Sequence, residues 1–103
     1  MLNFFEKTIN IDVIIEDGNM EVVKMTNKGQ ALCDGCIDSC ISTLRHDIYN
    51  LSSDKTVVFN LINRSRSSSG LVEDENVVVN KLHLIRSGAQ CNVIIRRGLN
   101  YLG

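Results

Sequence analysis

The stretch that decides the fold covers residues 27–51 and reads NKGQALCDGCIDSCISTLRHDIYNL. Its apolar and sulfur-bearing residues recur at steps of three and four, which is the period of an amphipathic helix. They are Cys33, Cys36, Ile37, Cys40, Ile41, Leu44, Ile48 and Leu51. Asn27 and Gln30 have the spacing of a helix capping box. The pattern therefore predicts one long helix over residues 30–51.

The segments on either side of this stretch are rich in β-branched residues and predict strands. Residues 8–16 and 20–25 flank a turn signal at 17–19 and predict a β-hairpin. Residues 55–63 have apolar side chains on both faces, which is typical of a central strand. Two further strands are expected, and they are residues 77–86 and 91–97, joined by a turn at 87–89. The serine-rich segment 64–76 is expected to be a loop.

These elements predict an α+β two-layer sandwich formed by a single domain over residues 1–103. Its sheet should have five strands, mostly antiparallel, in the element order ββαβββ. The one long helix should pack on one face of the sheet. No apolar run approaches the roughly 20 residues that a membrane span needs, so no membrane association is expected.

Location and charge give two further expectations. The first residues contain no secretory signal, so we expect a cytoplasmic protein whose thiols stay reduced. The net charge of −1 hides an asymmetry, because residues 1–54 contain nine acids and four bases while residues 55–103 contain three acids and seven bases. A basic half can indicate a phosphate-rich partner, but two oppositely charged surfaces on one compact domain are the favoured interpretation.

The four cysteines are Cys33, Cys36, Cys40 and Cys91, and they are the candidate ligands of a zinc ion or an iron–sulfur cluster. On a continuous helix Cys33 and Cys40 would be about 10 Å apart along the axis, at 1.5 Å per residue. This spacing favours buried apolar cysteines without metal or cofactor. The metal alternative stays open if the chain bends at Gly35 and the helix starts later. A disulfide or redox pair among these cysteines is a further, less favoured alternative.

No motif of an enzyme is present, so we expect a protein without catalytic residues. Basic side chains in the second half form a candidate surface for nucleic acid or another partner. They are Arg64, Arg66, Lys81, Arg86, Arg96 and Arg97. Few aromatic residues accompany them, which disfavours base stacking on a sheet.

The leading hypothesis is a cytoplasmic protein-binding module that acts through a sheet edge and the segment 64–76. The lack of a catalytic motif, the mixed charge and an exposed sheet edge are typical of small inhibitors or adaptors of larger machines. The eleven Asn and eleven Ile fit an AT-rich gene, which is compatible with a bacterial or phage origin. The alternatives are a nucleic-acid-binding protein and a small cysteine-ligated metal protein. A homodimer formed through an edge strand is a further alternative.

Overall fold

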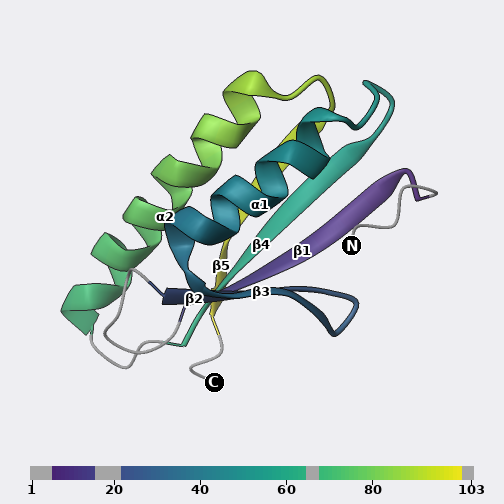
Figure 1. Ribbon diagram of the computed structural model, residues 1–103. Coiled ribbons are helices and arrows are strands. Elements are labelled where there is room, and N and C mark those ends of the chain that lie inside the picture. The colour runs from purple at the N-terminus through teal and green to yellow at the C-terminus, as the bar shows by residue number, and fades with distance from the viewer. Residues whose placement is uncertain (1–5, 16–21, 65–67, 101–103) are drawn as a thin grey trace.

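A computed structural model describes residues 6–15, 22–64 and 68–100. Within them, five strands and two helices form one small α+β domain (Figure 1). The elements are β1 Thr8–Ile15, β2 Val22–Asn27, β3 Gln30–Cys36, α1 Ile37–Tyr49, β4 Thr56–Asn63, α2 Ser68–Gly88 and β5 Asn92–Asn100. No helix in these ranges has the length and apolar character needed to cross a bilayer.

The strands form one mixed sheet in the order β3-β2-β1-β4-β5. The pairs β1–β2 and β2–β3 are antiparallel, as expected of hairpins. The pairs β1–β4 and β4–β5 are parallel. Each parallel pair is joined through a helix, which is the kind of connection that parallel neighbours require. The expectation of a mostly antiparallel sheet is therefore wrong.

Both helices lie side by side on one face of the sheet (Figure 1). Alternate residues of the central strands face them and are fully buried, as the period of two requires. The main core residues are Ile9, Ile11, Val13 and Ile15 of β1, Val57, Phe59 and Leu61 of β4, Cys40, Leu44 and Ile48 of α1, and Val78, Leu82 and Ile85 of α2. The other face of the sheet has no helix among the described residues.

The expected strand at residues 77–86 is wrong, because these residues belong to the second helix, α2. The run of valines at 77–79 favours a strand by composition, but Val78, Leu82 and Ile85 have helical spacing and are all 0% exposed. The turn expected at 87–89 is therefore the passage from α2 into β5. Of the expected loop at 64–76, residues 68–76 are helical, and residues 65–67 lie outside the described part of the chain.

The long helix expected over residues 30–51 is also wrong in its first third, because residues 30–36 form β3. Lys28 and Gly29 have φ angles of 53° and 79°, which is the type I′ turn that joins two strands of a tight hairpin. Asn27 and Gln30 are thus paired across this turn and do not cap a helix. Gly35 has a φ of 151°, a conformation that favours glycine, and it is paired with Val23 inside β3, which continues to Cys36 before α1 starts.

The strand expectations for residues 8–16, 55–63 and 91–97 are confirmed by β1, β4 and β5. The antiparallel pairing of the first two strands is also confirmed. The turn signal at 17–19 lies outside the described residues.

Candidate functional site

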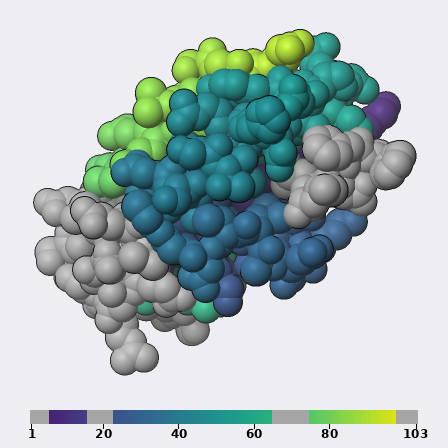
Figure 2. All heavy atoms as spheres, viewed as in Figure 1, coloured from purple at the N-terminus to yellow at the C-terminus, as the bar shows by residue number. Residues whose placement is uncertain are grey.

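The two edge strands of the sheet are β3 and β5. Among the described residues, β3 pairs with β2 alone, so its outer backbone groups have no strand beside them. Its seven residues are all exposed or half-buried. Figure 2 shows the blue atoms of the β2–β3 hairpin at the surface, beside the blue-green atoms of α1. This strand is the candidate functional site, and we call it the β3 edge.

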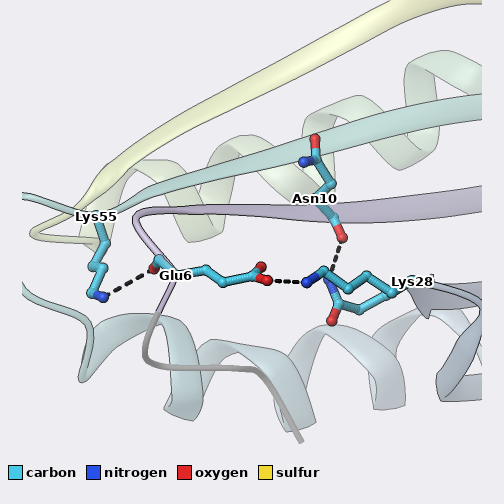
Figure 3. A network of polar contacts seen from close by, with 5 residues as sticks. Glu6, Asn10, Lys28 and Lys55 are labelled. Carbon is cyan, nitrogen blue, oxygen red and sulfur yellow. Dashed lines mark hydrogen bonds and ion pairs between the residues drawn. The ribbon is translucent and has the colours of Figure 1, made fainter.

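The turn end of the β3 edge is attached to β1 through polar contacts (Figure 3). Asn27 Nδ2 donates to Asn10 O at 2.6 Å, and Lys28 Nζ forms an ion pair with Glu6 Oε1. The carbonyl oxygen of Glu6 in turn accepts from Lys55 Nζ at 2.9 Å. These contacts connect the hairpin turn to β1 and to Glu6, the residue two places before β1, and Lys55 connects Glu6 to the start of β4.

The middle of the β3 edge is attached covalently. Cys33 of β3 and Cys40 of α1 form a disulfide, with their Cα atoms 5.6 Å apart. Cys33 pairs with the buried Met25 and therefore shares the helix-facing side of the sheet. A disulfide removes freedom from the chain segment that it closes. The strand is thus attached at the turn and again at its central residue.

The two edges differ in charge. Asp34 is the one charged residue of β3, whereas β5 contains Arg96 and Arg97. Charged side chains on an edge are a common means of preventing a further strand from adding. The β3 edge does have a bulge, since Ala31 pairs with Thr26 and Cys33 with Met25 while Leu32 has no partner. Its lack of basic residues makes it the less protected of the two edges.

The basic residues expected to form one binding surface are spread over several elements. Lys81 of α2 pairs with Asp38 of α1, and Arg97 pairs with Glu75 at 3.1 Å. Arg96 and Arg97 are neighbours on one strand, so their side chains lie on opposite faces of the sheet. The positions of the six are as follows: Arg64 follows β4, Arg66 lies outside the described residues, Lys81 and Arg86 are on α2, and Arg96 and Arg97 are on β5.

The four cysteines are not brought together. Cys33 and Cys40 are bonded to each other, and Cys36 is exposed, so the expectations that all thiols stay reduced and that Cys36 is buried are wrong. Cys91 is buried at the far end of α1, where its Sγ donates to Ile48 O at 3.9 Å. Burial raises the pKa of the Cys91 thiol. Within the described ranges, no three His, Cys, Asp or Glu residues are placed to hold a metal ion.

A row of polar residues on the helix-free face was missed in the sequence. Asp12 pairs with Thr26 on one side and with Asn60 on the other, and Asn60 pairs with Arg96. Asn60 Nδ2 donates to Asp12 Oδ1 at 3.3 Å. The alternation of Ile9, Ile11 and Val13 could have placed Asp12 on this face, but its neighbours depend on the sheet order. The described part of the molecule has no pocket.

Comparison with known protein families, with curated protein sequences and with solved structures finds no match for this chain. The candidate site is therefore inferred from the geometry of this structure alone. The distinctive features are an edge strand whose outer side has no strand beside it among the described residues, a turn attached to β1, and a disulfide to α1.

Proposed function

We propose that this chain is a protein-binding module that adds an extended segment of its partner as a new strand on the β3 edge. The observation that supports the proposal is the unpaired outer side of β3 among the described residues. In strand addition, main-chain hydrogen bonds provide affinity and alternate side chains provide specificity. We propose that it acts in the cytoplasm as an inhibitor or adaptor of a larger bacterial or phage assembly.

The rigidity of the β3 edge favours this mode of binding. A strand that is ordered before binding loses less conformational entropy when the partner arrives. Each main-chain hydrogen bond contributes about 1 kcal/mol net, so the few outward groups of seven residues support a modest, reversible affinity. A homodimer is the special case in which the added strand is β3 of a second copy.

The pairing pattern identifies an outward backbone donor. Asn27 and Gln30 close the two-residue turn and form its hydrogen-bonded pair. Hydrogen-bonded and non-hydrogen-bonded pairs alternate along an antiparallel ladder. The next pair, Thr26 with Ala31, is therefore of the non-hydrogen-bonded kind, and the N–H of Ala31 points away from β2.

This donor allows a sharp test. A phage-displayed library of random ten-residue peptides would be selected on the immobilised protein, and the affinity of enriched peptides would be measured by fluorescence anisotropy. Ala31→Pro removes the outward N–H while keeping the ladder with β2, and should weaken binding roughly 10-fold or more. Ala31→Ser keeps the N–H and should bind within about 2-fold.

The proposal fails if no peptide is enriched, or if Ala31→Pro and Ala31→Ser bind the enriched peptides equally well. Sedimentation of the free protein reports the homodimer separately, because a dimer through β3 should dissociate in Ala31→Pro. The nucleic-acid alternative has less support, because Lys81 and Arg97 are already paired with acidic residues.

A further inference from the structure

The Cys33–Cys40 disulfide has a special place in the fold, because it joins the candidate binding strand to the core. Cys40 is 0% exposed on α1, and Cys33 is half-buried on β3. In the described part of the chain, β3 has a strand on one side alone, so this bond is its main lateral attachment besides β2. The position of an edge strand of this kind depends on the disulfide more than the position of a central strand would, because a central strand is hydrogen-bonded on both sides.

The segment also contains a third cysteine. Cys36 is the last residue of β3 and is an exposed free thiol, while the fourth cysteine, Cys91, is buried elsewhere. The thiol chemistry of the accessible surface is therefore concentrated at the junction of β3 with α1. This junction lies at the end of β3, the strand that we propose as the binding edge.

We infer that the Cys33–Cys40 disulfide is a redox control of the β3 edge, an inference that rests on the function proposed above. In the oxidised form the strand is attached at the turn and at its central residue, Cys33, and can accept a partner strand. In the reduced form the stretch around Cys33 is free to move away from α1. The β3 edge is then ordered for a smaller fraction of the time, and its apparent affinity for the partner segment falls in proportion to that fraction.

The chemistry is a two-electron reduction by an external thiol reductant. One thiolate attacks the sulfur of Cys33, which is the half-buried partner, forms a mixed disulfide with it and releases Cys40 as a thiolate. A second thiolate attacks the external sulfur of the mixed disulfide and releases Cys33. The two cysteines take up two protons, and the reductant leaves as its own disulfide.

The test uses the full chain with Cys36→Ser, so that the accessible redox chemistry is limited to the pair. Amide hydrogen exchange of residues 30–36 would be compared in the oxidised sample and after treatment with dithiothreitol. Reduction should accelerate exchange of the β3 amides bonded to β2 by roughly 10-fold or more, while β1 and β4 stay protected. Cys33→Ala in the same background should match the reduced sample with and without dithiothreitol.

The binding measurement is made on the same samples, with peptides enriched on the oxidised protein as probes. Their affinity should fall roughly 10-fold on reduction. Unchanged β3 exchange, unchanged peptide affinity, or equal loss of protection in β1 and β4 would each overturn redox control of the edge. If no peptide is enriched, the proposed function itself fails, and hydrogen exchange still reports whether the disulfide holds the strand.

Discussion

Replacing Asn27 is expected to reveal how the β3 hairpin is attached to the sheet. β2 pairs with β1 over the four residues from Asp12 to Ile15, so Asn10 lies beyond the end of that ladder. The Asn27 side-chain amide satisfies the backbone carbonyl that the ladder leaves without a partner, because its Nδ2 donates to Asn10 O at 2.6 Å. Asn27 is 8% exposed, so water cannot easily replace this bond.

We expect Asn27→Ala to lower the free energy of unfolding by about 1–3 kcal/mol, because it leaves a part-buried carbonyl without its donor. With a urea m-value of about 1.5 kcal/mol/M, a loss of 1.5 kcal/mol would lower the midpoint by about 1 M. Asn27→Asp should be at least as destabilising, since a carboxylate oxygen would then face the carbonyl oxygen of Asn10.

Urea unfolding followed by circular dichroism measures the effect. Asn80→Ala is the matched control, because Asn80 is exposed on α2 and the same atoms are removed. It should change the free energy of unfolding by no more than about 0.5 kcal/mol. If Asn27→Ala were as mild as Asn80→Ala, the attachment of the turn to β1 would not contribute to stability as argued.

Three further outcomes are expected. Gly88→Ala should destabilise the fold by about 1–3 kcal/mol in urea titrations, because a methyl group there would overlap the Tyr49 ring; in a Tyr49→Ala background the same change should cost much less. Burial raises the pKa of the Cys91 thiol above its ordinary value of 9.0, so as the pH rises past 9.0 the unfolded chain releases this proton first. The free energy of unfolding should then fall more in wild type than in Cys91→Ala, and equal slopes in pH-dependent melts would contradict this. Arg97→Ala should cost less than about 1 kcal/mol, because its pair with Glu75 is partly exposed, and melts in 1 M salt should show a smaller difference still.

The sequence was sufficient to predict the strands whose apolar residues can be buried together in the extended conformation alone. In β1, Ile9, Ile11 and Val13 alternate with polar residues, and no helix would gather them on one face. β4 has apolar side chains on both faces and is a central strand, as its composition predicted. The α+β class follows from these segments together with the helical period of residues 37–49.

The candidate site could not be predicted to the same extent. The basic residues were expected to share a surface because Lys81 and Arg86 were assigned to a strand, and the helix separates them from Arg96. The residues of the β3 edge were not predicted as a strand, because they were assigned to the expected long helix. The positions of Lys28 and Gly29 in the middle of a polar stretch were the one local signal of a turn there.

Local sequence alone therefore determined which segments had to be buried, and that the start of β1 has one apolar face while β4 is apolar on both. The tertiary structure decided whether residues 30–36 and 77–86 became strand or helix, because their side chains can be buried in either form. It also decided the strand order, the parallel pairs and the Cys33–Cys40 bond. The physical reason is that these features depend on contacts between segments distant in the chain, or across the junction of β3 with α1, and a periodic pattern reports the neighbours of a residue along the chain alone.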